Sequence, residues 1–334
     1  QISIIGDFMA FEKLQESQPE VMQLLENSIQ KDRLSHAYLF EGQKGTKKFE
    51  IGLYFAMRLL CTDEKKPCGV CHNCRRIQNR THPNVYVIEP EKNMIRKQQI
   101  QDLQNEFNKT AVEPGPKVYI IRNIEMIHVN AANSLLKFLE EPHPNIHAIL
   151  TTENIHRILP TIISRSQVIQ FTSLSRKIVY QELVEEGYPE ETSHIISNLT
   201  SATGEAFDIA SNEFFMDILD LVKEIYRLLV TREEPLVIYF NENSSIIYQD
   251  SDLNDLFISS LMIYQKDIID YKIGNMYHIA FEKEIDTIQA IARDKTKNRL
   301  IEELESMLVL KSKVKSYINF RLAYDNLLLK LERR

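Results

Sequence analysis

In the first half of the chain, short apolar runs bounded by turn residues alternate with longer segments whose apolar residues recur every three or four positions. The short runs predict five strands, at residues 37–40, 85–88, 118–121, 148–151 and 168–171. The longer segments predict helices at residues 20–30, 47–60, 95–107 and 130–141. Strands that alternate with helices pair in parallel, because a right-handed crossover connects them most easily. We therefore predict a doubly wound α/β layer around a five-stranded parallel sheet.

After Phe171 the strand pattern ends and helical periodicity takes over, with paired serines and acids that predict a loop over residues 241–252. Long helical segments are predicted at residues 214–231, 253–270 and 296–331. The last segment has an apolar stripe formed by Leu304, Leu308, Val314, Ile318, Leu322, Leu327 and Leu331, and a lysine-rich stretch at residues 311–315 indicates a break in it. This stripe fits either the core of a helical bundle or an interface with a partner helix. The second half is therefore predicted to be all-α.

The charge of the chain limits how it can serve nucleic acid. Its 334 residues carry 40 Lys and Arg against 47 Asp and Glu, a formal charge of -7. An acidic chain repels a phosphate backbone, so any contact with nucleic acid is expected to be local or through partner proteins. No apolar run approaches the roughly 18 residues that span a bilayer, and the first residues lack the pattern of a secretory signal. We expect a cytoplasmic protein with no membrane partner.

All the cysteines of the chain lie close together in the sequence, at Cys61, Cys68, Cys71 and Cys74. Such clustering is typical of a metal site in a reducing compartment rather than of scattered disulfides. Four thiolates can close a tetrahedral shell around Zn²⁺ that leaves no open position for a reacting water. We therefore predict a structural zinc site, ahead of an iron–sulfur cluster or redox thiols. His72 is expected to face solvent or to support the ligands.

A loop that follows the first predicted strand and opens a helix has part of the P-loop pattern for phosphate binding. The positions kept are Gly42 and Lys48, with Gly45 between them. Lys47 stands where the pattern needs its second glycine, and Phe49 where it needs Ser or Thr. A phenyl ring cannot bind Mg²⁺, and a bulky residue hinders the approach of backbone to phosphate. We expect a degenerate loop without a functional ATP or Mg²⁺ site.

The end of the third predicted strand also departs from the pattern of an ATPase. In such enzymes this strand ends in carboxylates that hold the hydrated Mg²⁺ and orient the attacking water. Here the strand runs into Arg122 and Asn123. The first acid, Glu125, is expected to be a solvated residue at a helix start or on the surface. Because two separate requirements are missing, we expect no intrinsic ATPase activity.

Arg165 lies in the run Ser164-Arg165-Ser166, between a short helical segment and the fifth predicted strand. Most arginines in such a place are solvated or form a surface ion pair. In an oligomeric nucleotide motor, however, an arginine can reach the γ-phosphate bound to a neighbouring subunit and stabilise the transition state. Guanidinium suits this task because it is planar, permanently charged and bidentate. Arg165 is therefore a candidate for catalysis in trans.

Several motifs occur in order along the chain: residues 34–40, the four-cysteine insert, residues 133–142 and Ser164-Arg165. Together they resemble the clamp-loader AAA+ proteins of bacterial DNA replication over residues 34–171. Beyond this region the resemblance is weaker and rests on Asn319, Arg321, Leu322 and the run Asn326-Leu327-Leu328. Because the P-loop and the end of the third predicted strand lack residues that an ATPase needs, the chain resembles most closely the members of this family that do not hydrolyse ATP.

The resemblance implies three parts: an AAA+ domain at residues 1–172 with a zinc insert at 61–74, a small helical lid domain at 173–212, and a helical collar domain for oligomerisation at 213–334. It implies a hetero-pentamer with tau/gamma and delta subunits that loads a sliding clamp on primed DNA. Within that assembly the chain would be a rigid stator. Arg165 would be the arginine finger for the ATP site of the adjacent tau/gamma subunit.

The sequence departs from the pattern of this family at three places. Ser166 replaces the cysteine of a Ser-Arg-Cys motif, the first cysteine gap has six residues where eight is usual, and no basic residue stands near Gly204, where active relatives carry a lid arginine. The arginine and the four thiolates themselves are all retained. Two alternatives stay open: an active ATPase of the tau/gamma type, and a zinc-dependent protein that binds nucleic acid.

Overall fold

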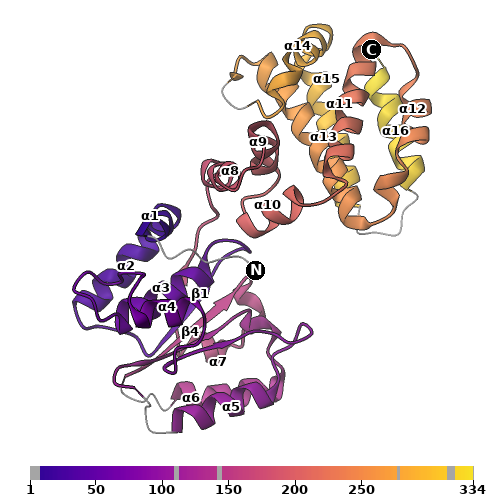
Figure 1. Ribbon diagram of the computed structural model, residues 1–334. Coiled ribbons are helices and arrows are strands. Elements are labelled where there is room, and N and C mark those ends of the chain that lie inside the picture. The colour runs from indigo at the N-terminus through magenta and orange to yellow at the C-terminus, as the bar shows by residue number, and fades with distance from the viewer. Residues whose placement is uncertain (1–7, 109–112, 141–144, 277–278, 314–319, 334) are drawn as a thin grey trace. The chain divides into compact units, whose positions relative to one another are not determined.

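A computed structural model describes residues 8–108, 113–140, 145–276, 279–313 and 320–333. The chain divides into two compact units, residues 1–175 and 176–334 (Figure 1). The division lies beside the predicted end of the first domain at residue 172, and the further division at residue 212 stays a prediction. Five residues on which the sequence predictions or the family resemblance rest lie outside the described residues: Glu141, Pro142, Val314, Ile318 and Asn319. Among the helices that the structure describes, none is long and apolar enough to cross a membrane.

The first unit contains the predicted sheet of five parallel strands. The strands are β1 (Ala37–Glu41), β2 (Val85–Ile88), β3 (Lys117–Ile121), β4 (Ile146–Thr152) and β5 (Gln167–Gln170). Their order across the sheet is β2-β3-β4-β1-β5, and the register places Leu39 between Leu150 and Val168. Because every pair is parallel, the carboxyl ends of the strands share one edge, where ligands bind in open α/β sheets.

Helices cover both faces of this sheet (Figure 1). They are α1 (Phe8–Ser17), α2 (Pro19–Gln30), α3 (Lys48–Leu60), α4 (His72–Gln78), α5 (Lys97–Asn108), α6 (Val129–Glu140) and α7 (Pro160–Ile163), with 3-10 turns η1 (Ile124–Met126) and η2 (Ile155–Arg157). Successive strand residues point to opposite faces. Tyr38 and Phe40 therefore join the core beneath α2 and α3, whereas Ala37 and Leu39 join the core beneath α5 and α6.

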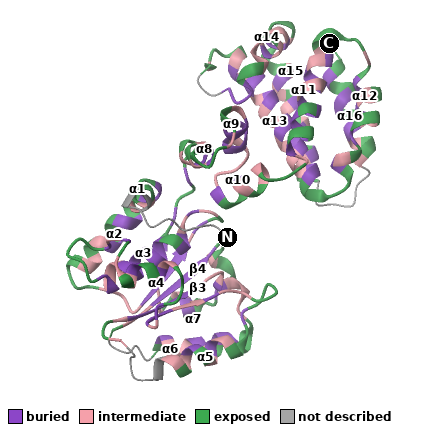
Figure 2. Ribbon diagram, viewed as in Figure 1, coloured by how far each residue is buried: buried purple, intermediate pink, exposed green. Residues whose placement is uncertain are grey.

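The second unit is all-α in its described residues, as predicted. Its elements are α8 (Arg176–Glu185), α9 (Glu190–Leu199), α10 (Thr203–Ala210), α11 (Phe215–Thr231), α12 (Leu236–Asn243), η3 (Ser245–Tyr248), α13 (Ser251–Lys272), η5 (Glu282–Glu284), α14 (Ile285–Asp294), α15 (Lys297–Ser312) and α16 (Phe320–Glu332). The long helix α13 packs against α11, α14 and α15, and buried residues run along α11 and α13 (Figure 2).

Two predictions for this unit were wrong in detail. The helical segment predicted at residues 296–331 contains α15 and α16, and α15 ends at Ser312, within the stretch where a break was indicated. Its apolar stripe is not one core face, because Leu327 is buried but Leu308 and Leu322 are exposed. The predicted loop at residues 241–252 is partly helical, since buried Phe240 and Ile247 anchor α12 and η3 in the core.

Candidate functional site

The loop between β1 and α3 contacts the ends of β4 and β5, the two strands that flank β1. Gly45 and Lys47 have positive φ angles of 80° and 64°, which glycine adopts freely and lysine only at a cost. A Cβ atom on Gly42 would lie 2.7 Å from the carbonyl oxygen of Phe171. The N–H of Gly42 donates to the carbonyl oxygen of Thr152 at 3.2 Å. The glycine is thus required for close packing on the segment that follows β5.

The ammonium group of Lys48 is turned into this loop. It donates to the carbonyl oxygens of Gly42 and Gln43 at 2.5 and 2.6 Å, and to Oγ1 of Thr46 at 3.2 Å. An ammonium group has three donors, so all of them are used within the loop. Burial lowers the pKa of Lys48, and nearby carboxylates oppose this effect. A phosphate would have to displace these contacts in order to pair with the lysine.

The side chain in the Ser/Thr position of the loop, Phe49, lies against two guanidinium groups. The guanidinium carbons of Arg80 and Arg122 are 4.8 and 4.5 Å from the centroid of the buried Phe49 ring, a favourable cation–π geometry. The carboxylate of Glu89 bridges them, at 2.6 Å from Arg122 and 3.1 Å from Arg80. Burial by itself would raise the pKa of Glu89, but these ion pairs lower it. The cluster thus places guanidinium groups against the side chain at the position where the P-loop pattern needs Ser or Thr.

Two carboxylates lie closer to the loop than the sequence indicated. Glu153 and Glu125, which follow β4 and β3, both act to raise the pKa of Lys48. Oε1 of Glu125 accepts the N–H of Glu153 at 3.1 Å, and its Oε2 is buried without a hydrogen-bond partner in the described part of the chain. Glu125 therefore lies at a helix start, as expected, but one of its carboxylate oxygens is buried rather than solvated. The reason is the turn η1, which carries the residue back toward β4.

A buried glutamine that sequence reasoning missed joins this loop to the end of β5. Nε2 of Gln18 donates to the carbonyl oxygens of Thr172 at 2.6 Å and Thr46 at 3.3 Å. The N–H of Thr172 donates back to Oε1 of Gln18 at 3.2 Å. Because Gln18 lies 154 positions from Thr172, nothing in the local sequence marks it. The contact fixes the segment by which the chain leaves the first unit.

The four cysteines converge, as their spacing predicted. Their sulfur atoms all lie within 4.8 Å of one another, with Cys61 at 3.6 Å from Cys68 and 3.8 Å from Cys71. Zn–S bonds of about 2.3 Å in a tetrahedron place sulfur atoms about 3.8 Å apart. The cluster could therefore hold Zn²⁺. Cys61 follows the end of α3, Cys71 caps the start of α4, and Cys74 lies within α4.

Backbone groups around the cluster favour thiolates, which are the form that binds metal. The N–H of Cys71 points to Sγ of Cys68 at 3.3 Å, and the N–H of Cys74 to Sγ of Cys71 at 3.5 Å. Burial by itself would raise the pKa of Cys71, but the N–H groups of Cys74 and Thr62 lower it to about 6. His72 is exposed and is not part of the converging set in the described residues.

Arg165 lies where α7 leads into β5, and its guanidinium is held on one side. Nη2 is 2.7 Å from Oε1 of Glu140, at the end of α6. Nη1 donates to the carbonyl oxygen of Thr161 at 3.0 Å and to Oγ of Ser164 at 3.4 Å. The side chain is 35% exposed. The position near Gly204, on α10, carries Glu205, whose carboxylate accepts the hydroxyl of Thr200 at 2.5 Å.

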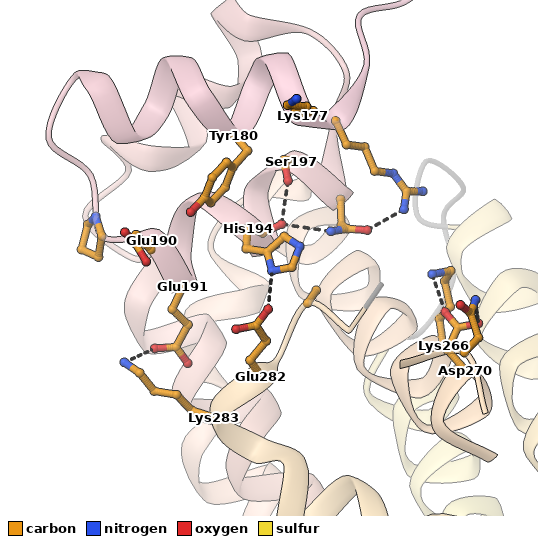
Figure 3. Close-up of a pocket in the computed structure, with 15 residues that line it drawn as sticks. Lys177, Tyr180, Glu190, Glu191, His194, Ser197, Lys266, Asp270, Glu282 and Lys283 are labelled. Carbon is orange, nitrogen blue, oxygen red and sulfur yellow. Dashed lines mark hydrogen bonds and ion pairs between the residues drawn. The ribbon is translucent and has the colours of Figure 1, made fainter. Parts of the chain in front are cut away.

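A cavity of about 910 Å³ in the second unit was not predicted (Figure 3). It is lined by α8, α9, α13 and the segment around η5. Charged side chains in its wall are paired with one another: Glu191 with Lys283, His194 with Glu282, and Lys266 with Asp270. Pairing of this kind compensates part of the charge in the wall, in which Arg176 and Lys177 also lie.

The sequence is similar to subunits of a bacterial replicative polymerase. The family described as DNA polymerase III, delta subunit, matches residues 17–175. The DNA polymerase III subunit delta' of Bacillus subtilis is 34% identical over 325 residues, which cover 97% of this chain and 99% of that protein. Subunit tau of the same organism is 33% identical over 164 residues, 48% of this chain and 29% of tau.

A solved structure of a gamma subunit-related protein from Thermotoga maritima matches 92% of this chain and 98% of its own, with 18% identity and a TM-score of 0.43. The identity to the Bacillus subtilis subunit extends over nearly the full length of both chains. This chain therefore belongs to the delta' family of DNA polymerase III clamp-loader subunits.

Proposed function

We propose that this chain is a subunit of the clamp loader that does not hydrolyse ATP. In this proposal it is a rigid stator beside tau/gamma and delta subunits in a hetero-pentamer, which opens a sliding clamp and places it on primed DNA. The AAA+ domain, the helical lid at residues 173–212 and the collar at 213–334 would divide these tasks, with the collar holding the ring together. Zinc would have a structural role.

One observation carries the first part of this proposal. Phe49 occupies the position of the Mg²⁺-binding hydroxyl, and Arg122 follows β3 where a carboxylate would be needed, with the guanidinium over the phenyl ring. Neither side chain offers an oxygen ligand, and hard cations such as Mg²⁺ require oxygen. Without the metal, the charge that develops on a transferred phosphoryl group is not neutralised. The loop can thus retain Lys48 for packing without supporting turnover.

The second part concerns Arg165. Its side chain is partly exposed, and two of its N–H groups, on Nε and Nη2, have no partner in the described residues. A guanidinium with free donors can bind a phosphate oxygen of an adjacent subunit. We propose that Arg165 is the arginine finger for the ATP site of the neighbouring tau/gamma subunit.

The test uses the reconstituted clamp loader, with only the motor subunit beside this chain able to bind ATP. Arg165→Ala should slow single-turnover hydrolysis at that site by about 10³-fold or more, the usual contribution of an arginine finger. Arg157→Ala, which removes another exposed arginine of the first unit, is the matched control and should leave the rate unchanged. Equal rates for wild type and Arg165→Ala would overturn the finger role.

An active ATPase of the tau/gamma type is the second candidate. Lys48 is present, and Glu125 and Glu153 lie close enough to affect its pKa. Hydrolysis of ATP by the isolated chain, abolished by Lys48→Ala, would establish this candidate. Absence of hydrolysis by the isolated chain, together with normal turnover in a loader that contains the Lys48→Ala variant, supports the proposal instead.

A further inference from the structure

Glu140 holds Arg165 at the corner between α6 and α7. The carboxylate is the last described residue of α6, and its Oε1 lies 2.7 Å from Nη2 of Arg165. The carbonyl oxygen of Thr161, on α7, accepts Nη1 of the same guanidinium at 3.0 Å. The two contacts come from different helices and act on different nitrogens. They therefore restrict both the position of the guanidinium and its rotation.

This arrangement leaves the arginine able to bind another anion. A guanidinium has five N–H donors. Glu140 forms an ion pair with Nη2, and Thr161 and Ser164 accept hydrogen bonds from Nη1. Neither Nε nor Nη2 donates a hydrogen bond to a residue that the structure describes. A phosphate oxygen could thus be bound while the contact with Glu140 is kept.

Restriction of this kind matters for transition-state stabilisation. A free arginine side chain samples many rotamers, and ordering it at the moment of reaction reduces the rate. Donors that are already aimed at the position where charge develops need no reorganisation. A carboxylate that holds one edge of the guanidinium can supply this order before the neighbouring subunit binds ATP.

We infer that Glu140 is a positioning residue for hydrolysis at the neighbouring ATP site: it acts through Arg165 and does not touch the nucleotide. This inference rests on the proposed finger role of Arg165. It assigns a task to the acidic end of α6, where the side chain of Glu140 is 49% exposed and lies outside the core.

The experiment measures single-turnover hydrolysis in the reconstituted loader at the site beside this chain. Glu140→Ala should lower the maximal rate by about 2- to 5-fold, the worth of one partly exposed ion pair, with the ATP concentration for half-maximal rate unchanged. Glu140→Gln should restore part of the rate, because the amide oxygen can still accept from Nη2. Glu91→Ala, which removes another exposed acid of the first unit, is the control and should have no effect.

A double-mutant cycle separates a positioning role from any other. If Glu140 acts through Arg165, the variant with both residues changed to alanine should react as slowly as Arg165→Ala alone and no slower. A further loss in the double variant would show an independent role for Glu140 and overturn the inference. So would a normal rate for Glu140→Ala in a loader that Arg165→Ala slows. No effect of Arg165→Ala would instead refute the finger role itself.

Discussion

At the scale of single residues, Gly42 is retained for packing whether or not the loop binds phosphate. A Cβ atom there would lie 2.7 Å from the carbonyl oxygen and 2.8 Å from the Cβ of Phe171. Gly42→Ala should therefore lower the free energy of unfolding by about 1–3 kcal/mol, a common cost of overpacking. Urea unfolding measures this change. Gly52→Ala is the control, because its new Cβ would make only ordinary contacts of 3.5 Å or more. Equal losses in the two variants would contradict the packing argument.

The residues of the site could be predicted more readily than their partners. The substitutions at Phe49 and at the end of β3 are visible in the sequence, because a motif fixes which residue types those positions need. The contacts of Arg80 with Phe49 and of Gln18 with Thr172 join distant positions. The same holds for the pair of Glu140 with Arg165. Such contacts follow from tertiary packing and have no local pattern.

At the scale of elements, the five strands were predicted correctly because buried parallel strands are short apolar runs between turn residues. Helices α1 and α4 were not predicted. α4 has only seven residues, which gives too few turns for an apolar stripe to appear, and Cys71 serves as its N-cap through a contact with the N–H of Cys74. The break between α15 and α16 was indicated by lysines rather than by any loss of apolar residues.

A buried acid joins α13 to the segment before η5 and should make stability depend on pH. Oδ2 of Asp267 accepts the N–H groups of Ala280 and Phe281, both at 2.9 Å. Burial nevertheless raises the pKa of Asp267 from 3.8 to about 7, and its Oδ1 is buried without a hydrogen-bond partner in the described residues. The protonated form is thus favoured by folding. The stability that protonation of Asp267 contributes is complete below pH 3.8 and is lost as the pH rises through about 7.

Asp267→Asn should remove this dependence, because an amide keeps an oxygen acceptor and carries no charge. We expect the variant to match wild type near pH 3, below the ordinary pKa of Asp, and to be more stable at pH 8 by about 1–3 kcal/mol. Urea unfolding at the two pH values measures the difference. Glu305→Gln, at an exposed position on α15, should leave the pH dependence unchanged. A variant that is less stable than wild type at pH 8 would show that the carboxylate is charged and stabilising.

At the scale of the whole molecule, the chemical features are divided unequally between the two units. The phosphate-type loop, the four cysteines and Arg165 all belong to residues 1–175, whereas residues 176–334 form a helical unit. The second unit buries a polar network of its own, in which Glu303 pairs with Lys295 at 2.8 Å and Arg299 at 3.1 Å. Each unit therefore has its own stabilising interactions, and a change confined to one of them can be followed separately.

Loss of zinc should affect the first unit alone. Cys71→Ala removes one of four thiolates and should abolish stoichiometric zinc, because a structural site needs a closed shell. Since Cys61 and Cys74 belong to the core beneath α3, we expect hydrogen exchange to become faster in residues 1–175 and to stay unchanged in 176–334. Elemental analysis and amide exchange measure the two effects. His72→Ala should keep the metal, because His72 is exposed and is not one of the converging side chains. Full zinc content in Cys71→Ala, or equal loss of protection in both units, would contradict a structural site confined to the first unit.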